Sequence, residues 1–279
     1  MDSLNFTVTS ERCTRCGACA NDCVSHIIQL PPQDGAPFVA DSDATRCLHC
    51  QHCLAVCPTG AVSIDGCRAD DSQPPASFGA PPSEAQMRGL VRGRRSVRQF
   101  APNDVEPALI NRLLDDLAYT PTGCNARELR MHVIAEGAVM DKFRERMFAA
   151  FRERAAGASG LPDVARFALE EWKNGRDLIF RGAPHALIIS APLSAPCPRE
   201  DVALALAQFE LLAVSAGLGT TWCGLLAGAL ALAPSLKPLL GLPTEGAHFY
   251  AMLFGVPSVS YARTVQRRLP DGAITRVSL

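Results

Sequence analysis

Residues 13–23 read Cys-Thr-Arg-Cys-Gly-Ala-Cys-Ala-Asn-Asp-Cys, and residues 47–57 read Cys-Leu-His-Cys-Gln-His-Cys-Leu-Ala-Val-Cys. Both stretches space their cysteines as C-x2-C-x2-C-x3-C, so the chain carries an internal repeat. The repeat accounts for eight of the twelve cysteines in a chain of 279 residues. Thiols repeated at this density predict an N-terminal region that folds around metal.

The spacing indicates which metal group these thiols hold. Three thiolates on one tight loop reach three corners of a single cubane, and the fourth, one helical turn later, points away and ligates another cluster. The sequence therefore predicts two 4Fe-4S clusters with crossed ligands. Each cluster takes three cysteines of one repeat and the last cysteine of the other: Cys13, Cys16, Cys19 and Cys57 in the first, and Cys47, Cys50, Cys53 and Cys23 in the second.

Zinc and disulfide bonds are the alternatives for these cysteines. Structural zinc takes four Cys or His ligands, usually from C-x2-C pairs with a longer spacer, which this pattern does not match. Disulfides need an oxidising compartment, whereas residues 1–5 show neither a basic start nor an apolar signal core. We therefore expect thiolates in a reducing cytoplasm. His26, His49 and His52 lie nearby in sequence and are expected to be hydrogen-bonding neighbours or surface residues.

Composition divides the chain into two domains. Residues 1–66 hold three basic and seven acidic residues, whereas residues 67–279 hold 24 basic and 21 acidic residues. A stretch rich in proline and small residues separates them, which predicts domains over 1–66 and 86–279 joined by a linker over 67–85. The net charge of −1 argues against nucleic-acid binding through bulk positive charge. The spacer between the two repeats contains Pro31-Pro32-Gln33-Asp34-Gly35 and is expected to be an extended hairpin loop.

One uncharged run, Leu211–Pro234, is long enough to span a bilayer. It is interrupted by Gly217, Gly219, Gly224 and Gly228, and no basic flank marks an inside end. The sequence therefore favours a buried helix, a glycine turn and a second short element over a membrane span.

The remaining pattern of the second domain is mixed. Apolar residues at helical spacing predict helices over 107–117, 141–156, 163–173 and 201–216, and short apolar runs predict strands over 130–135, 186–190 and 249–255. Four residues of the second helix are expected in the core, with substrate access as the alternative: Phe143, Met147, Phe148 and Phe151. Four arginines of the same helix are expected on a solvated face: Arg144, Arg146, Arg152 and Arg154.

Four segments of this domain have the chemistry of a ligand site. Gly93–Phe100 contributes Arg94, Arg95, Ser96 and Arg98, and arginine forks suit phosphate, although a solvated charged face is the alternative. Thr120–Arg127 is a turn-rich loop in which Asn125 offers both an amide donor and an acceptor. Gly217–Gly224 is a glycine loop after the buried helix. Arg263, Arg267 and Arg268 follow the last core strand.

In this order, the four segments resemble the nitroreductase family of FMN enzymes over residues 86–279. Residues 5–66 resemble the bacterial two-cluster ferredoxins. The two resemblances imply an α+β protein, with a ferredoxin-type domain that binds two 4Fe-4S clusters followed by an FMN domain built on a central sheet flanked by helices. They also imply a homodimer, because the family places its flavin at a two-fold interface.

The resemblance also implies which residues bind FMN. Arg94, Ser96, Arg98, Arg263 and Arg267 correspond to the family's phosphate and ribityl contacts, and Arg95 adjoins them. Asn125 and the loop from Thr221 to Gly224 correspond to its ring contacts. No side chain is expected to act as a catalytic acid or base, since the flavin carries the chemistry. The sequence departs from the family at Ala126-Arg127-Glu128, where members often have Gln-Pro-Trp. Four cysteines outside the repeats are expected to be buried structural residues, with a redox thiol at Cys124 as the alternative: Cys67, Cys124, Cys197 and Cys223.

The implied activity is an FMN-dependent oxidoreductase that passes electrons between its two clusters and FMN to reduce a small organic acceptor, such as a nitroaromatic or a quinone. A low-potential protein is the expected electron donor, and NAD(P)H is a further candidate. The alternative is a redox carrier or sensor that docks a partner through the acidic ferredoxin domain. A second domain without flavin is disfavoured by its two phosphate-binding segments.

Overall fold

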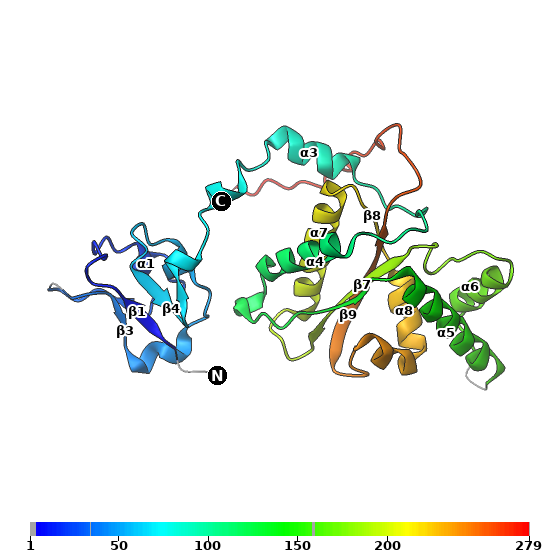
Figure 1. Cartoon of the computed structure of the whole chain (residues 1–279), viewed down its shortest axis with the longest axis horizontal. Coiled ribbons are helices and arrows are strands. Elements are labelled where there is room, and N and C mark those ends of the chain that lie inside the picture. The colour runs from blue at the N-terminus through cyan, green and yellow to red at the C-terminus, as the bar shows by residue number, and fades with distance from the viewer. Residues whose placement is uncertain (1–3, 34, 158–159, 279) are drawn as a thin grey trace. The chain divides into compact units, whose positions relative to one another are not determined.

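The computed structural model describes residues 4–33, 35–157 and 160–278 (Figure 1). The chain divides into two compact units. One comprises residues 1–81 with residues 124–126, and the other comprises residues 82–123 and 127–279.

The first unit is built from short elements. Its strands form one antiparallel sheet of order β1-β4-β5 and one hairpin, β2-β3. The strands are β1 (Phe6–Val8), β2 (Ile28–Gln29), β3 (Phe38–Val39), β4 (Val62–Ile64) and β5 (Cys67–Arg68). The helices are α1 (Ala18–Asn21) and α2 (His52–Ala55), with 3-10 turns η1 (Asp41–Arg46), η2 (Ala69–Asp71) and η3 (Pro75–Phe78). Strand β5 and turns η2 and η3 fall within the residues that the sequence assigned to the linker. In the expected hairpin loop, Asp34 lies outside the described residues.

The internal repeat is also a repeat of backbone conformation. Two positions within each cysteine motif and one just after it have a positive φ, and the positions correspond between the motifs: Arg15 with His49, Gly17 with Gln51, and His26 with Gly60. Gly17 and Gln51 stand directly before α1 and α2, with φ of 79° and 62°. Only glycine adopts this conformation without cost. The same chain path therefore presents Cys19 and Cys53 at equivalent positions, although one motif lacks the glycine.

The second unit is an antiparallel four-stranded sheet between two layers of helices. The strand order is β6-β7-β9-β8, which leaves β6 and β8 at the edges. The strands are β6 (Arg130–Ile134), β7 (His185–Pro192), β8 (Gly219–Trp222) and β9 (Ala247–Gly255). The helices are α3 (Glu84–Gly93), α4 (Pro107–Asp115), α5 (Gly137–Ala156), α6 (Asp163–Lys173), α7 (Pro198–Ser215) and α8 (Gly224–Leu232), with 3-10 turns η4 (Asp116–Tyr119), η5 (Gly123–Asn125) and η6 (Pro234–Leu240).

Successive side chains of the central strands point to opposite faces of this sheet, and each face has its own hydrophobic core. On β7, Ala186 and Ile188 pack with α5, α6 and α8, whereas Leu187 and Ile189 pack with α4 and α7. Figure 1 shows these helices on opposite sides of the strands. Strand β7 is therefore apolar at almost every position because both of its faces are covered. The observed folds of both units confirm the predicted α+β class.

The helices and strands expected from sequence are present, with ends that differ by a few residues. The run 211–234 contains the end of α7, the turn at Gly217, strand β8 and helix α8, so one more element follows the turn than expected. Among the helices in the described ranges, none has both the length and the apolarity needed to cross a membrane.

One prediction for α5 is wrong. Arg144, expected on a solvated face, is buried. Its guanidinium pairs with Asp141 and with Asp177, from which Nε lies 3.0 Å, and it donates to the carbonyl of Ala183. Asp177 also accepts hydrogen bonds from the backbone of the loop before β7. Arg144 therefore anchors that loop to α5, and the apolar side of α5, with Phe148 stacked on Trp172, is core as expected.

Three histidines of the second unit make its stability dependent on pH. Burial lowers the pKa of His132, His185 and His248. His185 is fully buried, and its Nε2 accepts the Val105 backbone N–H at 2.9 Å, which requires an unprotonated nitrogen. In the folded protein, the pKa of each of these histidines lies below the ordinary value of about 6.5. The stability that depends on their neutral form is therefore present above pH 6.5 and is lost as the pH falls toward the folded pKa.

We therefore expect the second unit to be less stable at pH 5.5 than at pH 7.5. Urea unfolding followed by tryptophan fluorescence measures this, because both tryptophans, Trp172 and Trp222, lie in this unit. In His185→Gln, the side-chain amide can still accept from Val105 but does not titrate, so the loss of stability on acidification should be smaller. An equal loss in the variant would contradict this role for His185.

Candidate functional site

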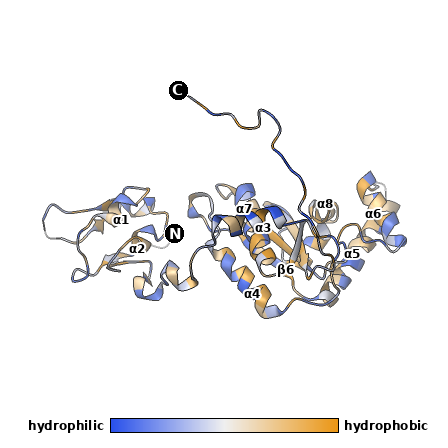
Figure 2. Ribbon diagram, turned by 90° about the horizontal axis from the view of Figure 1, so that it is seen from above, coloured by the Kyte–Doolittle hydropathy of each residue, from blue (hydrophilic) through white to orange (hydrophobic). Residues whose placement is uncertain are grey.

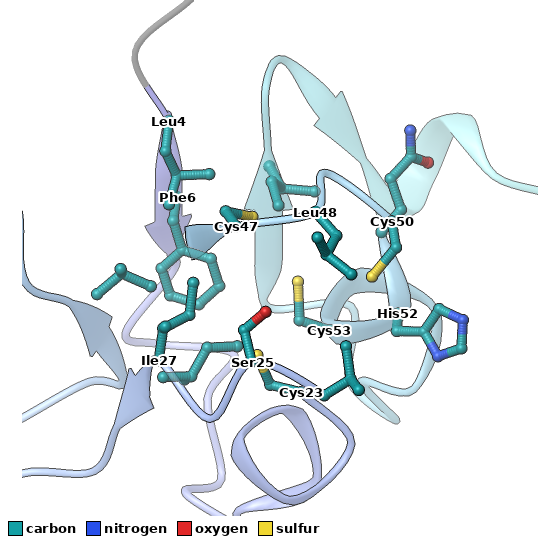
Figure 3. Close-up of a pocket in the computed structure, with 15 residues that line it drawn as sticks. Leu4, Phe6, Cys23, Ser25, Ile27, Cys47, Leu48, Cys50, His52 and Cys53 are labelled. Carbon is teal, nitrogen blue, oxygen red and sulfur yellow. The ribbon is translucent and has the colours of Figure 1, made fainter. Parts of the chain in front are cut away.

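The structure gathers four cysteines around one cavity of the first unit. Cys47, Cys50 and Cys53 of the second motif line it together with Cys23 of the first. Figure 3 shows their sulfur atoms turned toward the same space. Phe6 and Ile27 contribute to its apolar wall. This is the crossed grouping predicted from the spacing, and we propose that these four thiols hold one cluster.

A second cavity repeats the arrangement with the remaining four motif cysteines. Cys13, Cys16 and Cys19 line it together with Cys57 of the other motif. Cys67, the ninth cysteine of this unit, lines neither cavity, and its Sγ accepts a hydrogen bond from Gln51. We propose that this second set holds the other cluster.

The donors suit a cubane. Four thiols surround each space, and within the described residues no three His, Cys, Asp or Glu side chains converge on a point as a single metal ion requires. A cubane instead takes one thiolate at each of four corners. Backbone N–H groups already point at two sulfurs: Ala61 donates to Cys57 Sγ at 3.2 Å and His49 donates to Cys47 Sγ at 3.4 Å. Such bonds to cluster sulfurs tune the reduction potential.

The thiols differ in how readily they ionise. Burial raises the pKa of Cys53 to about 12. Burial also acts to raise the pKa of Cys57, but the hydrogen bonds from Ala61 and Thr59 outweigh it and leave the pKa of Cys57 below its usual value. Because metal ligation requires thiolates, iron binding must displace protons from these groups.

Two of the neighbouring histidines hold the cysteine loops together. Nδ1 of His49 lies 2.6 Å from an Asp65 carboxylate oxygen, and Nδ1 of His52 lies 3.1 Å from one of Asp22. Each pair joins a residue beside the second motif's cysteines to another part of the unit. Neither His49 nor His26 lines either cavity, while His52 lines the cavity of Figure 3.

In the second unit, the basic segment lies along strand β8. Ser96 forms a parallel bridge with Thr220, and the Val97 N–H donates to the Thr220 carbonyl at 2.8 Å. A Cβ on Gly219 would lie 2.8 Å from the Val97 side chain, so the absence of a side chain at Gly219 makes room for the basic segment. The sequence predicted that the glycine loop lets its backbone approach a ligand closely. At Gly219, the group that lies close to the backbone is instead the Val97 side chain.

The three arginines of this segment differ in their partners. Arg94 Nη1 donates to Glu210 Oε1 at 3.0 Å. In the described part of the chain, Arg95 and Arg98 make neither an ion pair nor a hydrogen bond, and Arg98 is exposed. Free guanidinium groups beside a strand edge are donors for an anionic group such as a phosphate.

Thr221 and Gly224 lie at the other end of β8. Thr221 is buried and pairs with Leu253 of β9, while Gly224 is exposed and begins α8. Gly224 also lines an apolar cavity of about 410 Å³ with Phe151 of α5 and Ala168 of α6. A Cβ on Gly224 would lie 2.8 Å from the Tyr250 hydroxyl, so a larger residue here would displace the end of the Tyr250 side chain. Thr221 directly follows Thr220, which pairs with Ser96, and Gly224 comes after the last strand residue, Trp222.

Two predicted parts of the flavin site belong to neither strand β8 nor the basic segment. Residues 124–126, and with them Asn125, cluster with the first unit. Arg263 and Arg267 lie in the exposed segment after β9 (Figure 2), which is tied to the basic segment by the Tyr261 hydroxyl, 3.5 Å from the Ser96 carbonyl. The structure thus joins Arg94, Arg95, Ser96, Arg98, Thr221 and Gly224 through β8, and their role in binding FMN stays a prediction.

The loop around Asn125 has an unusual backbone. Cys124, Asn125 and Arg127 all have φ above +50°. The loop is held by the Gly123 N–H, which donates to Asp201 at 2.9 Å, and by the Arg127 N–H, which donates to Thr122. Such strain concentrates at functional sites. The expectation that Cys124 is buried is wrong, because its side chain is exposed; Cys223 is buried as expected, and Cys67 and Cys197 are half-buried.

The predicted flavin-binding residues that β8 joins are therefore cationic side chains beside an edge strand and a glycine after its end that lines an apolar cavity. A phosphate suits the first group, and an apolar ring system suits the second. Sequence reasoning missed Glu210, which is the single charged residue among the apolar positions of α7 after Asp201 and joins Arg94 to β8.

Comparison with known families identifies both units. Residues 91–256 match the nitroreductase family, and residues 12–61 match the 4Fe-4S dicluster domain. Because the first match covers more than half of the chain, the chain belongs to the nitroreductase family. The protein is thus a flavin-dependent oxidoreductase that carries a ferredoxin-type iron–sulfur domain, and both predicted resemblances are confirmed.

Solved structures share the fold of the second unit. A nitroreductase with bound FMN from Bacteroides fragilis has a TM-score of 0.56 at 20% identity, over 71% of this chain and all of that one (100%). The FMN-dependent nitroreductase NfnB from Mycobacterium smegmatis, in complex with NADPH, has a TM-score of 0.52 at 20% identity, over 70% and 100%.

Among curated proteins, the DNA-directed RNA polymerase subunit Rpo3 of Methanosarcina mazei is 33% identical over 58 residues. The chain spans about a fifth of the length of the curated relatives it matches, 21% in each case.

Proposed function

We propose that the protein transfers electrons between two 4Fe-4S clusters in its first unit and one FMN in its second, and that it reduces a small organic acceptor. The observation that carries this proposal is the crossed grouping of cysteines around two cavities, in a chain whose other unit has the nitroreductase fold. Clusters exchange single electrons, whereas FMN accepts electrons singly and delivers two, so the combination converts one kind of transfer into the other.

The chain's own residues would bind and orient these groups. Eight motif cysteines hold the clusters, and Arg94, Ser96 and Arg98 receive the FMN phosphate, assisted by Arg95, Arg263 and Arg267. Asn125, Thr221 and Gly224 contact the ring. No side chain is assigned as a proton donor, and the pocket's task is to exclude water from the ring and to position the acceptor.

The cavity beside Gly224 supports an apolar acceptor. All of its lining residues are glycine, proline, phenylalanine or aliphatic, among them Phe151, Ile179 and Leu225. Since burying a charged group here would leave it without a partner, the cavity favours an uncharged planar compound such as a quinone or a nitroaromatic. NAD(P)H is a candidate donor, and the structural relative from M. smegmatis is recorded with NADPH.

We further propose that the protein works as a homodimer in a reducing compartment such as the cytoplasm, and that a low-potential electron carrier protein docks on the first unit.

Anaerobic isolation followed by titration tests the proposal. We expect about eight iron atoms and about one FMN per chain. Reduction of the flavin is then followed by its visible absorbance after addition of NADH, NADPH or a reduced ferredoxin. A quinone is added last to reoxidise the flavin. Reduction only by ferredoxin would identify the clusters as the entrance for electrons. Zinc in place of iron, or an absence of flavin, would refute the proposal. A flavin that reacts with no donor or acceptor would favour a redox carrier.

A further inference from the structure

The carboxylate of Glu210 lies at the centre of the contacts that join the basic segment to β8. Its Oε1 accepts from Arg94 Nη1 at 3.0 Å and from the Thr220 hydroxyl at 3.3 Å, and its Oε2 accepts from Trp222 Nε1 at 3.2 Å. The residue is 6% exposed. A buried carboxylate is tolerated only when donors satisfy it, and here both oxygens are satisfied by the segments proposed to face the flavin.

The same contacts continue to the other end of the strand. The centroid of the Trp222 ring lies 5.8 Å from that of Tyr250, whose hydroxyl occupies the space that a Cβ on Gly224 would need. Side chains therefore connect the proposed phosphate-binding arginine to the proposed ring-binding glycine through Glu210, Trp222 and Tyr250. Arg94 and Gly224 come from segments far apart in sequence, and these side chains supplement the backbone pairing of the basic segment with β8.

We propose that Glu210 is a positioning residue for flavin binding, which holds the Arg94 guanidinium so that its remaining N–H groups are presented to the phosphate. The inference rests on the proposed function, since it assumes that Arg94 receives this group. Glu210 engages one terminal nitrogen of Arg94, and the Arg94 side chain keeps 29% of its surface exposed. Fixing a flexible arginine before the ligand arrives lowers the entropic cost of binding.

Comparison of FMN with riboflavin isolates this role, because riboflavin lacks the phosphate. The full-length protein, stripped of flavin, is titrated with each compound, and quenching of flavin fluorescence gives the dissociation constants. In Glu210→Gln an amide NH2 group faces one of the donors, so Arg94 or Trp222 loses its acceptor. We expect FMN affinity to fall roughly tenfold, the effect of one buried unsatisfied hydrogen bond, with riboflavin affinity little changed.

Two further variants refine the test. Trp222→Phe removes the Nε1 donor but leaves the Arg94 pair, so it should lower the ratio of FMN to riboflavin affinity less than Glu210→Gln does. Glu145→Gln, on the exposed face of α5, is the matched control and should change neither affinity.

An unchanged affinity ratio in Glu210→Gln, or equal weakening of both ligands, would overturn the inference, the latter by indicating a merely structural role. Tighter FMN binding would also overturn it, by showing that Glu210 competes with phosphate for Arg94. If the unmodified protein binds no FMN, the proposed function itself fails.

Discussion

The double variant Cys16→Ala/Cys57→Ala should retain about four iron atoms per chain, the same number as either single variant. Cys16 and Cys57 line the same cavity although they belong to different motifs. Removing two corners of one cluster costs no more iron than removing one, because the cluster is lost in both cases. The measurement is iron and sulfide per chain after anaerobic reconstitution.

The pairing Cys16→Ala/Cys47→Ala provides the comparison, because these residues line different cavities and the double variant should retain almost no iron. Cys67→Ala is the matched control within the same unit and should keep about eight iron atoms. If each cluster instead took all four cysteines of one motif, Cys16→Ala/Cys57→Ala would lose both clusters, and the crossed grouping would be wrong.

Arg98→Ala should weaken FMN retention by roughly tenfold to a hundredfold while iron content stays unchanged. A hydrogen bond from a charged group contributes roughly 1.5–3 kcal/mol, and each 1.4 kcal/mol corresponds to a factor of about ten in affinity. Arg98 is exposed and without a partner in the described chain, so its removal should not disturb folding. The measurements are the FMN dissociation constant and iron per chain.

Arg92→Ala is the matched control, since Arg92 is an exposed arginine in the last turn of α3 and should bind FMN like the unmodified protein. Loss of iron with full retention of FMN would refute the division of labour between the two units.

The cysteine groups could be predicted from sequence because their spacing is a local constraint. A turn that carries three thiols fixes which three act together, and one helical turn fixes that the fourth points elsewhere. The repeated positive φ values could be anticipated at Gly17 but not at Gln51, where residue type gives no such signal. The helices and strands could be predicted for the same reason, because apolar periodicity involves residues only a few positions apart in sequence.

Contacts between distant segments could not be predicted in this way. The burial of Arg144 depends on Asp177, and the pairing of Arg94 depends on Glu210, 116 residues away. Nothing in the local pattern distinguishes Arg144 from its exposed neighbour Arg146. The grouping of residues 124–126 with the first unit likewise arises from tertiary packing, so a ring contact by Asn125 could be proposed only from resemblance.

The crossed cavities also set an order for biosynthesis. The cavity of Cys13, Cys16 and Cys19 has no fourth thiol until Cys57 has left the ribosome, whereas Cys23 is waiting when Cys53 emerges. A nascent chain that ends between the motifs therefore offers an assembly factor only incomplete ligand sets. The ligand sets that we propose for the two clusters are completed close together, at Cys53 and at Cys57, so neither set is complete before most of the second motif has been synthesised.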